Sequence, residues 1–421
     1  MLLRTLVRSS AATLVLPLLV GFVFLALSDD LSNWVTAHYW LSATGSSTFA
    51  LPFVSAACAA VAAWEGARLN RGRVFAQAPV RGSWAITLPM LLPVMVMGLV
   101  AMGAALLISV MAAGLGAGVP HPGMLLVVTG VLASNILVGH LLGRVMPGVL
   151  AAPLALIGSF FLNAYPSSWS IYWLRHLVGG GLDSCCSVDS TVDERAVLSA
   201  LVFTTGVCLG AALLVHRRGG MAALTAAVLL TAGGFATAAY IARDLTSEPV
   251  LPRATSALRC EGDRPQICLW PEVSDQGMVR REARTVVARL ERAGIPAPHT
   301  LTMAARPPAG ALKLGIPANP RAEDIPAGIA SGLLPEPPAC ALDGEPFPAG
   351  IAAAPVASWL YATAGEPAQA NAGRFGERET AFAQKVRKQP LAVQTDWYER
   401  NMKAMRHCGT QPQLGLAGGA G

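Results

Sequence analysis

Two cysteines frame a short polar loop in the stretch CEGDRPQICLWPE, which runs from Cys260 to Glu272. Cysteines this close together can hold a metal ion, carry redox chemistry or form a structural disulfide. A zinc site would need further ligands at suitable spacing, but residues 243–421 contain only His299 and His407, and no second closely spaced cysteine pair. This absence argues against a metal site in this part of the chain.

Other catalytic patterns are also missing from the sequence. The chain has no glycine-rich loop ending in Gly-Lys-Ser/Thr, no His-Glu-x-x-His and no Gly-x-Ser-x-Gly. His407 and Cys408 are neighbours in sequence, which does not supply the spatial arrangement that nucleophilic catalysis requires. We therefore predict no enzymatic activity, no catalytic residue, no metal and no cofactor, and ATP-driven work would need ATP bound by a partner chain.

The composition indicates a membrane protein. The chain has 421 residues, of which 53% are hydrophobic and only 13% are charged. Charge is concentrated in residues 243–421, which carry 20 Lys+Arg and 18 Asp+Glu, against 11 and 7 in residues 1–242. A membrane block is therefore followed by a soluble, charge-balanced domain.

Seven apolar runs have the length of about 20 residues that a bilayer crossing needs. They lie near residues 10–28, 47–65, 85–112, 123–143, 147–165, 196–216 and 221–242. The first run follows Arg4 and Arg8 as in a signal peptide, but no small-x-small cleavage site follows it, which favours a retained signal anchor.

The charges between the runs predict an orientation. With a cytoplasmic N-terminus, nine arginines lie inside and only two, Arg175 and Arg195, lie outside. Seven spans then place residues 243–421 on the outer face of the cell membrane. The net charge of +6 needs no nucleic-acid partner, because the arginines lie at the ends of apolar runs rather than on one face.

This orientation predicts which of the cysteines can form disulfides. Cys58 and Cys208 lie within spans and are expected to be small apolar packing residues, whereas the other six lie outside, where disulfides form. Four of those six are in the soluble domain, Cys260, Cys268, Cys340 and Cys408, and they allow three connectivities. We expect pairs 260–268 and 340–408, the first closing a small loop and the second tying the final helix to the domain.

The external segment SSWSIYWLRHLVGG, residues 167–180, carries Trp169, Tyr172 and Trp173. Their spacing and aromatic character suit a short interfacial or re-entrant helix. An ordinary aromatic belt at the end of a span is an equally good interpretation.

The cytoplasmic segment WEGARLNRGRVFAQAPVRGSW, residues 64–84, is the most distinctive feature of the membrane block. Its notable residues are Trp64, Glu65, Arg68, Arg71, Arg73 and Arg81. Positive-inside anchoring explains such a segment, and so does a docking element for a cytoplasmic partner. Both interpretations stay open at this stage.

The soluble domain has a pattern typical of a small α+β fold. A helix is predicted over residues 274–293, short strands near 295–318, mostly loop over 316–350, and helices near 350–364 and 377–407, the last with a break at Pro390. The expected organisation is a membrane domain (1–218), an additional transmembrane helix (219–242), a linker (243–256), an extracytoplasmic domain (257–410) and a disordered tail (411–421).

Three short motifs support a family resemblance: W-E-x-x-R-L at 64–69, C-L-W-P-E at 268–272, and Q-x-x-W at Gln394 and Trp397. With them the chain resembles ABC-2-type permease subunits of actinobacteria that carry an additional span and an extracytoplasmic domain. The resemblance implies a six-helix permease core and a homodimer or heterodimer of membrane subunits in the lipid bilayer. It also implies a separate ATPase chain docking on residues 64–84 to drive export. The alternative is a membrane-anchored binding, sensor or accessory protein without transport activity of its own.

Overall fold

The computed structural model of the protein describes residues 10–28, 35–74, 82–116, 118–216, 220–296, 298–342 and 344–415. The chain is mostly helical and divides into two compact units, Met1–Leu251 and Pro252–Gly421. The division falls inside the predicted linker, residues 243–256.

Within the described part of the first unit, six helical stretches are long and apolar enough to cross a membrane, with lengths of 21 to 32 residues. They agree with the last six of the seven predicted spans, of which the first lies near residues 47–65. In order they are α4 to α5 with the turn between them (Trp40–Ser47, Thr48–Ala50 and Leu51–Arg71), α6 (Ser83–Ala113), α7 (Pro122–Val145), α8 with the turn after it (Gly148–Ala164 and Tyr165–Ser168), α10 (Glu194–His216) and α11 (Met221–Ala242).

The first predicted span, residues 10–28, folds as the shorter apolar helix α2 (Ala12–Ser28) of 17 residues. At 1.5 Å per residue its length is about 26 Å, slightly less than a hydrocarbon core of about 30 Å. It contains Pro17, a residue that membrane helices tolerate better than soluble ones.

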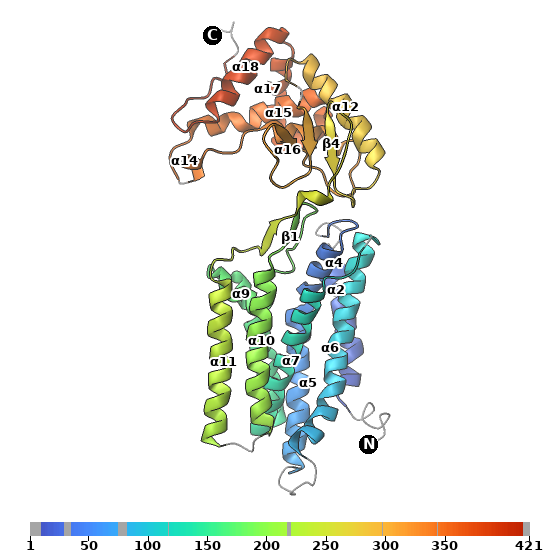
Figure 1. Cartoon of the computed structure of the whole chain (residues 1–421), viewed down its shortest axis with the longest axis vertical. Helices are drawn as coiled ribbons and strands as arrows, with labels where there is room; N and C mark the ends of the chain where they lie inside the picture. Colours follow the sequence, from blue (N-terminus) through green and yellow to red (C-terminus); the bar gives the residue numbers. More distant parts are fainter. Residues whose placement is uncertain are drawn as a thin grey trace. The chain divides into compact units, whose positions relative to one another are not determined.

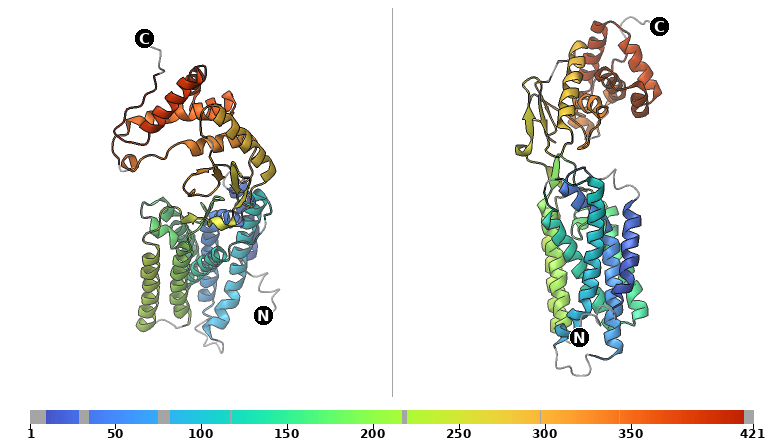
Figure 2. Two further views of the ribbon diagram at one scale, coloured as in Figure 1. Left: turned by 45° about the horizontal axis from the view of Figure 1, so that its top comes forward. Right: turned by 90° about the vertical axis from the view of Figure 1, so that its right-hand side faces the viewer.

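The long helices run side by side (Figure 1). Helix α5 packs against α7, α8, α6 and α2, whereas α10 packs against α7 and α11. The two views in Figure 2 show the same arrangement from other directions. Helix α7 therefore lies between the group around α5 and the pair formed by α10 and α11.

Glycines allow α7 to lie very close to α5. Gly139 and Gly143, one turn apart, face the backbone carbonyls of Ala59 and Ala63, and a Cβ added at either glycine would overlap with those oxygens. Gly66 of α5 meets the backbone of α7 in the same way. Close backbone approach through small residues is the usual source of helix association where the surrounding solvent is itself apolar.

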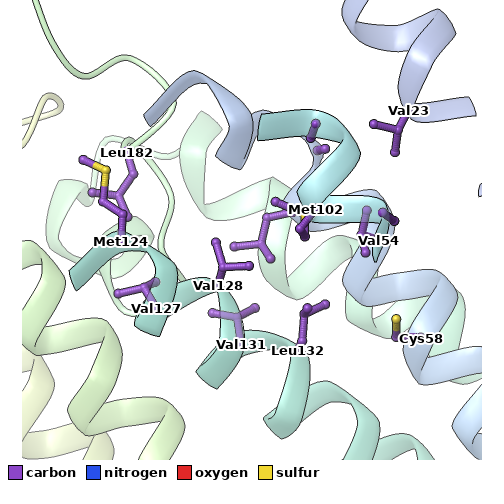
Figure 3. Packing of buried hydrophobic residues seen from close by; sticks show 14 of the residues in the cluster. Val23, Val54, Cys58, Met102, Met124, Val127, Val128, Val131, Leu132 and Leu182 are labelled. Atoms are coloured by element: carbon purple, nitrogen blue, oxygen red, sulfur yellow. The ribbon is translucent and has the colours of Figure 1, made fainter. Parts of the chain in front are cut away.

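The same device joins α10 to α11. Gly206 and Gly210 are also four residues apart, and a Cβ at Gly206 would lie 3.0 Å from the Cα of Gly234 in α11. The hydrophobic core of the first unit is filled by aliphatic and sulfur-containing side chains, among them Val54, Met102, Val131 and Leu132 (Figure 3). Cys58 is fully buried in this core, as expected for a packing residue.

The first part of the predicted linker is not a free tether. Leu245 is buried with Leu177 of the first unit, and the Nε2 atom of His176 lies 2.8 Å from the carbonyl oxygen of Thr246. Further on, the amide of Asp193 donates to the carbonyl of Pro249, beside the two-stranded sheet of β1 (Ser190–Val192) and β2 (Val250–Pro252). Residues 243–251 therefore pack as part of the first unit.

The second unit combines a small sheet with a helical part, which lie on different sides of α12 in the right view of Figure 2. The sheet has the order β3-β4-β5-β6, with β3 antiparallel to β4 and the other pairs parallel. Its strands are β3 (Arg259–Glu261), β4 (Gln266–Leu269), β5 (Thr300–Thr302) and β6 (Ala311–Lys313). The helices are α12 (Gln276–Arg292), α13 (Asp324–Leu333), α14 (Ala339–Leu342), α15 (Ala353–Ala364), α16 (Ala368–Phe375), α17 (Glu377–Arg387) and α18 (Leu391–Ala404).

Local signals placed several of these helices correctly. Helix α12 begins after Asp275, whose side chain accepts a hydrogen bond from the Met278 amide as an N-cap. The predicted break at Pro390 separates α17 from α18, where the proline occupies the N-cap position of α18.

Two sequence-based expectations for the second unit differ from the structure. Residues 316–350 are predicted to be mostly loop, yet they contain the ten-residue helix α13. This helix forms because Pro326 stands in its first turn, where no amide bond is lost, and because Ile325 and Ile329 are buried. Residues 411–415 belong to the expected disordered tail, yet Asn401 of α18 bonds to both backbone groups of Gln413. Residues 416–421 lie outside the described residues.

A single methyl group tests the α5–α7 contact. We expect Gly143→Ala to destabilise the full-length protein by about 1 to 3 kcal/mol, because the new Cβ forces the helices apart. The matched control is Gly103→Ala on α6, where no atom lies within 4 Å of the added Cβ and alanine's helix propensity stabilises by up to about 1 kcal/mol. Unfolding in detergent measures both, and equal effects at the two sites would contradict the packing.

Candidate functional site

The predicted docking segment begins on α5 and continues past its end. Trp64, Glu65, Arg68 and Arg71 lie in the last two turns of α5, and Arg73 follows in the turn after Gly72. The Arg71 guanidinium carbon lies 5.2 Å from the centre of the Trp64 ring, a cation–π contact. Arg81, the sixth predicted residue, lies outside the described residues.

Glu65 is the buried member of this segment, with 1% of its surface exposed. One carboxylate oxygen accepts a hydrogen bond of 2.9 Å from the Ala11 amide, and the other lies 2.8 Å from a guanidinium nitrogen of Arg68. The Ala11 amide belongs to the first turn at the start of α2, where a negative charge is favoured by the helix dipole. Glu65 thus ties α5 to α2 rather than adding charge to the surface.

Three helices, α2, α7 and α8, contact α5 where the basic segment begins. Beside Glu65, Gly66 lies against the backbone and the imidazole of His140 in α7. An added Cβ at Gly148, at the start of α8, would lie 3.1 Å from a nitrogen of Arg71. A displacement of the end of α5 would therefore act directly on α2, α7 and α8.

The predicted external helix is shorter than expected. Helix α9 covers only Tyr172–His176, and Trp169 lies before it, in an extended conformation after the turn Tyr165–Ser168. Trp169 and Tyr172 are 43% and 45% exposed, whereas the ring of Trp173 lies 6.0 Å from that of Phe235 in α11. The three aromatic residues therefore do not form one helical stripe. Trp169 and Tyr172 are partly exposed, and Trp173 packs inward.

Arg175 holds residues 167–177 together through hydrogen bonds. One guanidinium nitrogen donates to the carbonyl of Ser167 at 2.6 Å and to that of Trp169 at 3.3 Å, and the other donates to Ser247 at 3.4 Å. Next to it, burial lowers the pKa of His176 below its ordinary value. The segment is a folded cap rather than a loose loop.

Sequence reasoning gave no role to a polar cluster between α7 and α8. The Oδ1 atom of Asn135 accepts hydrogen bonds from the Ser159 hydroxyl at 2.7 Å and the Asn163 amide at 3.3 Å. Asn163 is 4% exposed, and its Oδ1 atom has no hydrogen-bond partner among the described residues. Asparagines within apolar runs are the visible signal, but their positions 28 residues apart do not reveal that they meet.

The four cysteines of the second unit pair as expected, with both pairs at disulfide-bonding distance. Cys260 and Cys268 are directly opposite each other on β3 and β4, so the pair closes a β-hairpin. Cys340 and Cys408 join α14 to the segment after α18. In the first unit the adjacent Cys185 and Cys186 are also paired, and both are buried.

Trp270 fixes the chain next to the Cys260–Cys268 disulfide. It is fully buried, and its indole nitrogen donates a hydrogen bond of 3.0 Å to the carbonyl of Met303. Arg253 lies over the Trp270 ring at 4.5 Å and bonds both carboxylate oxygens of Glu272, at 3.0 and 2.8 Å. The CLWPE motif therefore has a structural role: its side chains fix the segment between the end of β4 and the start of α12.

Among the residues that the structure describes, one group of potential metal ligands comes together, in the second unit: Cys340, Cys408 and Glu345. The two sulfurs are joined to each other, which leaves a single exposed carboxylate. One carboxylate does not make a transition-metal site, and soft metals prefer thiolates.

The two disulfides should differ in their contribution to stability. In the loop-entropy treatment, the separation of 8 residues between Cys260 and Cys268 corresponds to about 2.5 kcal/mol. The separation of 68 residues between Cys340 and Cys408 corresponds to about 4.4 kcal/mol. We expect the double serine variant of the second pair to lose more stability than that of the first, measured by unfolding of the full-length protein. A reducing agent should lower the stability of the wild type more than that of the quadruple serine variant, which keeps only the Cys185–Cys186 pair, and equal stability of all variants would contradict the pairing.

Comparison with known proteins adds one finding. Residues 267–408, about a third of the chain, match the model of a family described as a domain of unknown function, DUF7224. The match covers the second unit from β4 to Cys408. No curated protein and no solved structure gives a significant match to the chain.

Proposed function

We propose that this chain is the membrane subunit of an ABC-2-type export system. A separate ATPase chain would dock on the basic segment 64–84, and the present chain would contribute no catalytic residue. Its work would be mechanical, since ATP binding and hydrolysis by the partner would shift the helix bundle between two packings.

The observation that carries this proposal is the connection of the basic segment to the bundle. Arg68 and Arg71 lie at the end of α5, within reach of a partner, while Glu65 and Gly66 join the same turns to α2 and α7. A partner that binds the arginines would therefore move helices rather than a loose loop. Simple positive-inside anchoring does not require these contacts.

The membrane topology belongs to the same proposal. Arg68, Arg71 and Arg144 stand at the C-terminal ends of α5 and α7, as the positive-inside rule requires for a cytoplasmic side. We propose seven spans including α2, a cytoplasmic N-terminus, an extracytoplasmic second unit and a homodimer or heterodimer of membrane subunits.

Charge reversal in the docking segment tests the proposal. The full-length protein, purified from its native membranes, should carry an ATP-hydrolysing chain, and Arg68→Glu, Arg71→Glu and Arg73→Glu together should remove it. Loss of about 1.4 kcal/mol of binding already weakens retention tenfold. Because Arg68 also pairs with Glu65, the double variant of Arg71 and Arg73 separates docking from stability.

The matched control reverses three exposed arginines on α12, Arg281, Arg284 and Arg292, and should retain the ATPase chain. Two results would refute the proposal: transport activity by the purified chain alone, or unchanged retention of the ATPase in the triple variant at the end of α5.

A second candidate is a membrane-anchored binding or sensor protein. It is favoured by the second unit, which is compact, closed by two disulfides and covered by the family match. If residues 250–415 fold alone and bind a defined ligand, while variants of the docking segment have no phenotype, this candidate replaces the first.

A further inference from the structure

Two cavities of about 520 and 480 Å³ lie beside α7 in the first unit. Both are bounded by α7, α10 and α11, and they share five lining residues: Val138, Phe203, Val207, Thr231 and Phe235. They therefore form one continuous groove. Along α10 it extends from Phe203 to Leu214, about 16 Å at 1.5 Å per residue.

The larger cavity is closed at one end by the external segment, including Tyr165, Trp169 and Leu177. Below this cap the polar side chains of Ser134, Asn135, Asn163 and Thr204 line it. The smaller cavity has only Thr231 as a polar lining side chain. Among the described residues, no charged side chain lines either cavity. The groove is thus polar near the cap and apolar along the rest.

The asparagine network keeps unused hydrogen-bonding capacity at the polar end. Asn135 donates one amide hydrogen to the carbonyl of Val131 at 2.8 Å, which leaves its second amide hydrogen. Asn163 has an unpartnered Oδ1 atom within the same cluster. A spare donor beside a spare acceptor matches a group that is both, such as a hydroxyl.

We propose that this groove binds an uncharged single-chain amphiphile with a hydroxyl head, the hydroxyl at Asn135 and Asn163 and the alkyl chain along Val138 and Val207 toward Leu214. Apolar walls alone do not select an occupant in a bilayer, because lipid tails are equally apolar. The polar end supplies the selection. A charged head is disfavoured there because no opposite charge lines the cavity and burying an ion is costly. The site lies apart from the basic end of α5, so it does not depend on an ATPase partner.

Photolabelling tests this assignment. The full-length protein in phosphatidylcholine nanodiscs is labelled with a 16-carbon alcohol that carries a diazirine in its chain, and with the matching methyl ether. The ether keeps the chain but has no donor. We expect the alcohol to label peptides containing residues 131–138 or 203–214 about 3- to 10-fold more than the ether, the range for a hydrogen bond in a membrane interior.

Three variants make the outcome decisive. Asn135→Leu should abolish the preference for the alcohol while the ether still labels the groove. Val138→Trp should fill the groove and remove labelling by both probes. Val96→Trp, on an exposed part of α6 outside the groove, should change neither. Equal labelling by both probes in the wild type, or groove labelling that survives Val138→Trp, would overturn the assignment.

Discussion

Helices that associate in an apolar surrounding have no hydrophobic effect to hold them together, so they depend on close backbone contact and on a few polar bonds. In this protein α5 and α7 satisfy that constraint through Gly66, Gly139 and Gly143. The other helices of the first unit are arranged around this pair, with α8, α6 and α2 on α5, and with α10 on α7. Helix α11 in turn packs against α10, and glycines again allow the close approach.

The few polar groups within this bundle have distinct positions. Glu65 joins two helices near the basic end of α5, while Asn135, Ser159 and Asn163 join α7 to α8 beside the groove. Polar side chains are expensive in an apolar environment and persist where they are bonded or functional. Glu65 has partners for both oxygens, whereas the asparagine cluster does not use all of its capacity. This difference separates a structural tie from a binding group.

Much of the architecture is readable from the sequence because it is local. Six of the apolar runs, the cap of α12 and the break at Pro390 depend on residues within one or two turns of each other. The sequence leaves three connectivities open for the four cysteines of the second unit, and the expected pairing rests on the closeness of Cys260 and Cys268 in sequence; the hairpin that brings these two together is seen only in the structure. Long-range partners were not readable. Glu65 looked like the single acid of a basic segment, because nothing in its neighbourhood points to Ala11. Helix α13 was missed because its buried isoleucines are masked by proline and glycine, which usually indicate loops.

The bond between Glu65 and Ala11 also bears on how the chain is assembled during synthesis. Helix α2 is made before α5, and the acceptor for its leading amide arrives 54 residues later, with the end of α5. Helix α5 in turn reaches its closest neighbour only when Gly139 and Gly143 have been made. Helices α2 and α5 therefore lack part of their final contacts until the ribosome has added the residues up to Gly143. During that interval the insertion machinery or lipid has to cover the surface of α5 against which α7 later packs.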